Sequence, residues 1–196
     1  MKMKMKNLLK SSLYLAALTA ISLTSCKKDK DAVVAPAKPN ENEVITTFKV
    51  VFQQSDKPAF QSVFVWRDLD GDGPLKPSSF DTIRLLPNKT YNTSFIILDE
   101  TKTPADSTSN EVEEEGTDHQ FFFKSLLGLN LTTAYADKDA NNVPIGLKTT
   151  VTTGAAGKGN WNIILKHQPA VKPKSGNGDE SKGSVDLTLT FPVKID

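Results

Sequence analysis

The chain has 196 residues, of which 38% are hydrophobic and 24% are charged, and its formal net charge is +1. This near-neutral balance gives no reason to expect nucleic acid as a partner, because proteins that bind it carry a strong positive charge. The single cysteine, Cys26, excludes a disulfide within the chain and any metal or redox site built on two cysteines.

The first 25 residues have the organisation of an export signal. Four lysines fall within the first ten residues, and no acidic residue comes before Asp29. The apolar run 13–21 that follows is shorter than the about 20 residues needed to cross a bilayer. A basic start, a short apolar run and small residues before a cleavage point are typical of secretory signals. We therefore expect residues 1–25 to be removed.

The end of this segment, Leu23-Thr24-Ser25-Cys26, resembles the lipobox of bacterial lipoproteins, in which cleavage precedes the cysteine. The resemblance implies that Cys26 begins the mature chain and carries diacylglycerol and an N-acyl chain, enough to anchor it stably. An ordinary secretory signal with a chance cysteine is the alternative. Cleavage leaves 20 basic and 23 acidic residues, a net charge of −3.

The stretch that follows the lipobox is a predicted tether. Residues 26–42 are charged and then rich in Ala and Pro, with no apolar period, which is typical of a flexible linker. The folded part is therefore expected to stand off the membrane. We expect a location at the outer membrane, facing either the periplasm or the cell surface.

From Glu43 onward, apolar residues recur at every second position, as they do in strands with one buried face. Turn-forming Gly, Pro, Asn and Asp residues separate these runs. The acidic stretch before His119 predicts a short solvated helix that begins at Asn110 and ends before Gly116. Strands are expected over about 44–52, 59–67, 80–86, 90–98, 119–124, 131–136, 145–152, 160–168 and 185–195.

Eight or nine strands with almost no helical period predict an all-β fold. The favoured architecture is a single antiparallel β-sandwich of the Ig-like, Greek-key type over 43–196. An eight-stranded β-barrel is the alternative. Pro192 lies inside the last predicted strand, and a proline there favours an edge position or a bulge.

Two loops have carboxylates spaced as in a calcium-binding loop, where side-chain oxygens at positions 1, 3 and 5 surround the ion. The first has Asp68, Asp70 and Asp72, but Ser79 stands where a bidentate glutamate is expected. The second is a weaker match. It has Asp137, Asp139 and Asn141 in the corresponding positions. Calcium is the candidate cofactor, and ordinary tight turns are the competing interpretation.

The two histidines, His119 and His167, each lie at the end of a predicted strand and in phase with its apolar residues. If those strand ends adjoin, two imidazoles and a nearby carboxylate have the chemistry to hold zinc or copper. The simpler interpretation is two histidines at the rim of the core that bond to the backbone. The acidic run 111–115 is expected to be a solvated segment, and a docking patch for a basic partner is the alternative.

Signals of catalysis are weak. The chain has no GxSxG or HExxH motif and no second cysteine, and the spacing of its histidines supports no nucleophile–base arrangement. We therefore do not expect an enzyme. Asp81-Thr82-Ile83 and Asp106-Ser107-Thr108 resemble the O-glycosylation acceptor of Bacteroidota, which makes Ser107 and Thr82 candidate acceptors. Ser107 falls in an expected flexible loop and Thr82 in an expected strand.

Several short stretches, taken together, resemble a family of small Bacteroidota lipoproteins. They are the lipobox and tether, Glu43–Thr47, Arg67–Pro74, the run 111–115 with His119 and Gln120, Ala134–Asp137, Pro144–Leu147 and Leu165–His167. Members are sometimes labelled type 1 periplasmic binding fold proteins, but that fold has two α/β lobes and this chain shows almost no helical period. The resemblance implies an envelope location and no established activity.

The sequence as a whole therefore predicts a lipid-anchored envelope sandwich with a binding or scaffolding role. Its partners would be the membrane, through the lipid, and a protein or glycan. A metal-binding lipoprotein is the alternative.

Overall fold

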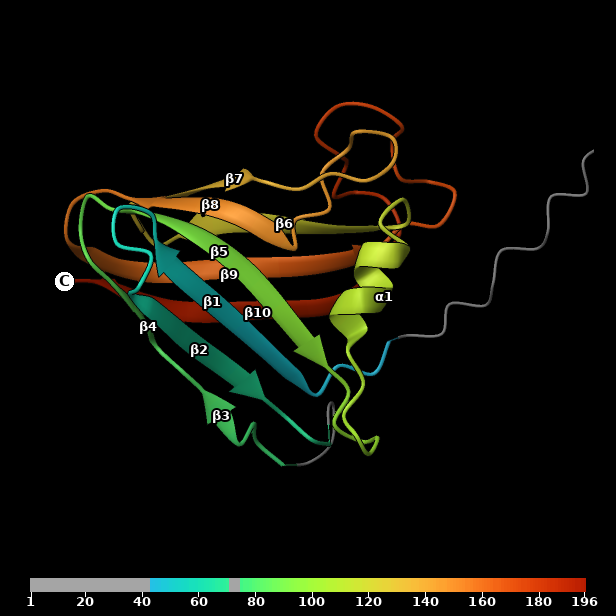
Figure 1. Cartoon of the computed structure of the whole chain (residues 1–196), viewed down its shortest axis with the longest axis horizontal. Coiled ribbons are helices and arrows are strands. Elements are labelled where there is room, and N and C mark those ends of the chain that lie inside the picture. Colours follow the sequence, from blue (N-terminus) through green and yellow to red (C-terminus); the bar gives the residue numbers. More distant parts are fainter. Residues whose placement is uncertain (1–42, 71–74) are drawn as a thin grey trace, which may run out of the picture. The chain divides into compact units, whose positions relative to one another are not determined.

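The computed structural model describes residues 43–70 and 75–196, all within one compact unit, Ala37–Asp196. This part of the chain contains ten strands and one helix, α1 (Thr108–Glu114) (Figure 1). The strands are β1 (Thr47–Gln54), β2 (Gln61–Arg67), β3 (Ser79–Phe80), β4 (Ile83–Leu85), β5 (Thr90–Leu98), β6 (His119–Leu126), β7 (Leu131–Tyr135), β8 (Lys148–Thr153), β9 (Gly157–His167) and β10 (Ser184–Ile195).

The strands form two sheets that pack face to face. The six-stranded sheet has the order β3-β2-β1-β5-β8-β7, and the four-stranded sheet has the order β4-β10-β9-β6. Neighbouring strands are antiparallel, except that β4 runs parallel to β10. The predicted β-sandwich is therefore confirmed. The barrel alternative is wrong, because the strands form two separate sheets rather than one closed sheet.

Aromatic rings from both sheets fill the space between them. Phe48 of β1 stacks on Phe95 of β5 with ring centroids 5.4 Å apart, and both lie in the six-stranded sheet. Phe48 also meets Phe121 and Phe191 of the facing sheet at 6.1 and 6.3 Å. These residues occupy the alternate, inward positions of their strands, which explains why the two-residue period of the sequence located the core.

The third predicted strand, 80–86, is split between the two sheets. Asp81 ends β3 by pairing with one residue of β2: its side chain accepts from the Val65 amide at 2.8 Å, and its own amide donates to the Val65 carbonyl at 3.0 Å. The chain then crosses to the other sheet, where β4 pairs with Val193–Ile195 of β10. The strand period cannot predict such a crossing, because β3 and β4 are both extended.

The shortness of β4 leaves much of β10 at an edge. In the described part of the chain, no strand pairs with residues 184–192 of β10 on the side where β4 lies. Pro192 falls in this portion, which agrees with the edge position expected for it.

The helix α1 confirms the predicted short helix, although it begins earlier, with Ser107 rather than Asn110 as its N-cap residue. Val112 and Thr108 are its buried residues, so one face packs on the sandwich and the glutamates remain outside. Within 43–70 and 75–196, no helix has the length and apolar character needed to cross a membrane.

Candidate metal centre

His119 and His167 meet at one end of the four-stranded sheet. They are directly opposed in the antiparallel pairing of β6 with β9. Their rings stack with centroids 4.6 Å apart and planes inclined by 9°. His119 is buried and His167 is half-buried. The two strand ends thus adjoin, which is the condition that the sequence set for a histidine site.

Glu115 completes a group of three potential ligands. One ligand atom from each of Glu115, His119 and His167 lies within 4.8 Å of the others. The backbone carbonyl of Glu115 also lies 3.2 Å from Nδ1 of His119. A backbone carbonyl in this position orients an imidazole. Two imidazoles and one carboxylate are a donor set suited to zinc or copper.

Two further carboxylates face the other nitrogen of His119. Its Nε2 lies 3.3 Å from Oε1 of Glu43 and 3.9 Å from Oδ2 of Asp186. Burial alone opposes a charge on the ring, but the adjacent Glu43 carboxylate outweighs it, and the pKa of His119 is raised. Burial, together with the neighbouring His119, lowers the pKa of His167. The two rings of the stack therefore differ in their tendency to be charged.

Asp186 does not lie where the strand alternation placed it. The period assigned it to the outer, polar face of the last strand, yet its side chain is 1% exposed. A register shift between Val185 and Leu187 changes the alternation at this point and turns the side chain inward. Both of its carboxylate oxygens lack a hydrogen-bond partner, as does Oε2 of Glu43. Burial raises the pKa of Asp186 to about 6.

A buried lysine supports the backbone of the site. Nζ of Lys172 donates to the carbonyls of Gly116 and His119 at 2.7 and 2.9 Å and pairs with Oδ2 of Asp139 at 2.8 Å. It therefore joins three segments: the α1–β6 turn, the β7–β8 loop and the β9–β10 loop. The sequence placed Lys172 in a loop, and no local pattern indicated that it would be buried.

In the second predicted calcium loop, the carboxylates accept hydrogen bonds from backbone amides of the protein. Oδ1 of Asp139 accepts from the amides of Asn141 and Val143, and its Oδ2 contacts Lys172. Asp137 accepts from the amides of Gly146 and Lys148 at 2.7 and 2.8 Å. Asn141 is exposed. The calcium hypothesis for this loop is therefore not supported, because its carboxylates bind the protein itself.

The first predicted calcium loop is only partly described. Asp68 is buried and Asp70 is exposed, with Oδ2 of Asp70 accepting from the Leu75 amide at 3.1 Å. Asp72 lies outside the described residues, so calcium at this loop stays a prediction. The loops after β2 and β7 do not form a joint site among the described residues: the two strands are separated by three others, and no group of three carboxylates forms there.

The two candidate glycosylation acceptors differ from their expected settings. Ser107 is half-buried at the N-cap of α1, and its amide donates to Oδ1 of Asp106 at 2.9 Å. Thr82 lies between β3 and β4 and is exposed. Thr82 is therefore the more accessible of the two, contrary to the expectation. Cys26 lies outside the described residues.

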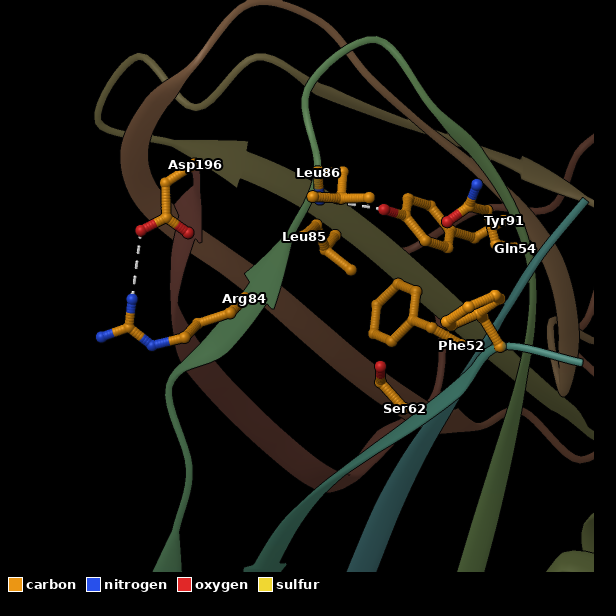
Figure 2. A pocket seen from close by; sticks show the side chains of 9 residues that line it. Phe52, Gln54, Ser62, Arg84, Leu85, Leu86, Tyr91 and Asp196 are labelled. Atoms are coloured by element: carbon orange, nitrogen blue, oxygen red, sulfur yellow. Dashed lines mark hydrogen bonds and ion pairs between the residues drawn. The ribbon is translucent and has the colours of Figure 1, made fainter. Parts of the chain in front are cut away.

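A small cavity of about 230 Å³ lies at the opposite end of β9 and β10 (Figure 2). Phe52 and Tyr91 point into it, and Arg84 and Asp196 stand at one side. Several of its polar groups already have partners: Arg84 pairs with Asp196 at 3.2 Å, and the Tyr91 hydroxyl accepts from the Leu86 amide at 2.9 Å. The cavity therefore offers a ligand little beyond apolar contact.

No protein-family model matches the chain, and no curated protein and no solved structure matches it either.

Proposed function

We propose that this protein is a lipid-anchored envelope protein of the outer membrane whose β-sandwich binds a divalent transition metal, zinc or copper. The ligands are His119, His167 and Glu115. The observation that carries the proposal is the convergence of their ligand atoms to within 4.8 Å of one another. Zinc holds nitrogen and oxygen ligands at about 2.0–2.2 Å, so the three ligand atoms must move closer together to surround one ion.

The parallel stacking of the rings supports a second candidate function. Lone pairs of stacked imidazoles lie in parallel planes, so one ring must rotate before both can bind one ion. Two imidazole rings whose planes differ by 9° also form a stable contact without a metal. A binding or scaffolding module that uses another surface is therefore the alternative, and the metal titration below separates the two.

Calorimetric titration of the metal-free chain with zinc chloride and with copper(II) chloride tests the metal proposal. We expect one equivalent to bind, and His167→Gln and Glu115→Gln each to weaken binding by about tenfold or more. Glu114→Gln is the matched control, since it removes the neighbouring exposed carboxylate of the same helix end. Unchanged affinity in both ligand variants, or no binding to the unmodified chain, overturns the proposal.

A stability measurement gives an independent result. A metal at 100 times its Kd adds about 2.7 kcal/mol to the free energy of unfolding, which raises the melting temperature by several degrees. His167→Gln should remove this shift while Glu114→Gln keeps it. A shift of equal size in all three proteins would mean that the metal binds elsewhere.

The lipid anchor is tested separately, by incorporation of labelled palmitate in cells. We expect labelling of the unmodified chain and none of Cys26→Ala. Labelling that persists in the variant would exclude Cys26 as the site of lipidation. It would favour the alternative that residues 1–25 are an ordinary secretory signal.

A further inference from the structure

A groove runs beside the unpaired part of β10. Its volume is about 800 Å³, and one wall consists of residues 186–190 of that strand. The other walls include residues 43–46 and, from β2, β3 and the loop after β2, Trp66, Asp68, Asp70 and Phe80. Figure 1 shows β10 at one side of its sheet, with β4 beside its C-terminal end only. We call this feature the β10 groove.

The edge of β10, rather than one of its faces, lines the groove. Successive side chains of a strand point to opposite faces, so a strand face contributes every second residue to a cavity. Here five consecutive residues, 186–190, contribute. No described strand pairs with them on the side away from β9. An unpaired edge presents backbone amides and carbonyls, and these are able to accept another strand.

The groove has a strong negative character. Glu43, Asp68, Asp70 and Asp186 all line it, and no lysine, arginine or histidine is among the described residues that do so. The Asp186 side chain is 1% exposed, and neither of its oxygens has a hydrogen-bond partner, although Nε2 of His119 lies 3.9 Å from its Oδ2. A buried carboxylate without such partners is costly, and a cationic group nearby reduces that cost.

Apolar contacts are also present. Phe80 is 48% exposed at the groove, and Leu187 and Leu189 of β10 belong to its wall. The groove therefore combines the three features that recognise an extended peptide: an open strand edge, apolar contacts and a charge of one sign.

We propose that the β10 groove binds an extended, lysine- or arginine-containing segment of a partner protein, which pairs with β10 as an added strand. Five residues of such a segment span about 16 Å along residues 186–190. A second copy of this chain is a poorer occupant, because joining two β10 edges would bring two acidic grooves together. This proposal does not depend on the metal centre, and it supplies a binding role in its own right.

The experiment measures fluorescence anisotropy of a fluorescein-labelled octapeptide of alternating lysine and valine, added to the full chain in detergent with chelator present. We expect binding that weakens as salt rises. A glutamate–valine octapeptide should not bind. Asp70→Lys should weaken the lysine probe by about tenfold. Glu114→Lys is the matched control, since it changes an exposed charge on α1, outside the groove.

Strand pairing is tested on the probe, which leaves the fold of the protein untouched. Two versions of the lysine–valine peptide carry N-methyl groups on alternate sets of residues. An added strand uses the amides of one set only, so one version should lose binding and the other keep it. Equal binding of both versions overturns strand addition. The proposed occupant is overturned if Asp70→Lys and Glu114→Lys weaken peptide binding equally. It is also overturned if the chain forms a dimer that excludes the peptide.

Discussion

Nζ of Lys172 lies 2.8 Å from Oδ2 of Asp139, and both side chains are 1% exposed. The ammonium group also donates to the carbonyls of Gly116 and His119. Burial lowers the pKa of Lys172, and the contact with Asp139 opposes that effect. Among the described residues, Asp139 is the carboxylate that forms an ion pair with Lys172. Removing its charge should therefore lower the free energy of unfolding substantially.

Asp139→Asn should destabilise the protein by about 3–5 kcal/mol, because it leaves a buried ammonium without its counter-charge. Asparagine keeps an oxygen for the amides of Asn141 and Val143, so the loop itself is preserved. The measurement is urea unfolding. The double variant Asp139→Asn with Lys172→Met should recover much of the loss. A single variant within about 1 kcal/mol of the unmodified chain would contradict the assigned role.

Glu100 should contribute stability that depends on pH. Arg67 donates to both of its carboxylate oxygens, and Thr47 donates to Oε1. These contacts lower the pKa of Glu100 from 4.5 to about 2. Because the folded pKa is the lower one, the contribution is complete above pH 4.5 and is lost as pH falls toward 2.

The comparison for Glu100 is with Glu100→Gln, by thermal melting across the acid range. We expect the unmodified chain to be the more stable of the two at pH 6, with a gap that narrows steadily below pH 4.5. A gap that stays constant would mean that the ionisation of Glu100 is not what stabilises the fold.

Gly146→Ala should be strongly destabilising. The residue has φ +93°, and an added Cβ would lie 2.8 Å from Cβ of Phe121. The positive φ costs about 1–2 kcal/mol for a residue with a side chain, and overpacking adds about 1–3 kcal/mol. Gly128 is the matched control, because it has φ +75° and open space around it. Gly128→Ala should therefore show the backbone cost alone, and equal losses would refute the close approach.

Trp161 should be tolerant of phenylalanine but not of alanine. Its side chain is fully buried, and its ring lies 5.6 Å from that of Phe123 and 6.0 Å from those of Phe52 and Phe95. Trp161→Ala should cost about 3–5 kcal/mol in unfolding experiments. Trp161→Phe should cost less than half of that, because it also removes the buried Nε1, which has no hydrogen-bond partner. Similar losses for both variants would point to a partner for Nε1.

The sequence predicted much of the fold because each strand has one buried face. Alternation alone located nearly every strand and the inward side of residues such as Phe48 and Phe191. It failed at Asp186, where the register shifts, and at 80–86, where the chain changes sheets at Asp81. Periodicity is a local property, and both events are decided by which strand lies alongside.

The candidate metal centre was predicted in part, for a related reason. His119 and His167 lie at the ends of predicted strands and in phase with apolar residues, so the sequence predicted that both lie near the core. Their meeting depended on the pairing of β6 with β9, which the sequence left open. Three other residues at the site follow no sequence pattern that predicts their position. Glu115 lies at a helix end, Glu43 at the start of the domain and Lys172 in a loop.

By itself, the sequence determined the all-β class, the positions of the core residues and the types of side chain available for chemistry. These follow from the two-residue period and the composition, which are local properties of the sequence. Only the tertiary structure decided which strands are neighbours, and through that the stacked histidine pair, the buried Lys172–Asp139 contact and the open edge of β10. These features join residues far apart in the chain, and contacts at that separation depend on sheet order and register, which a local pattern does not encode.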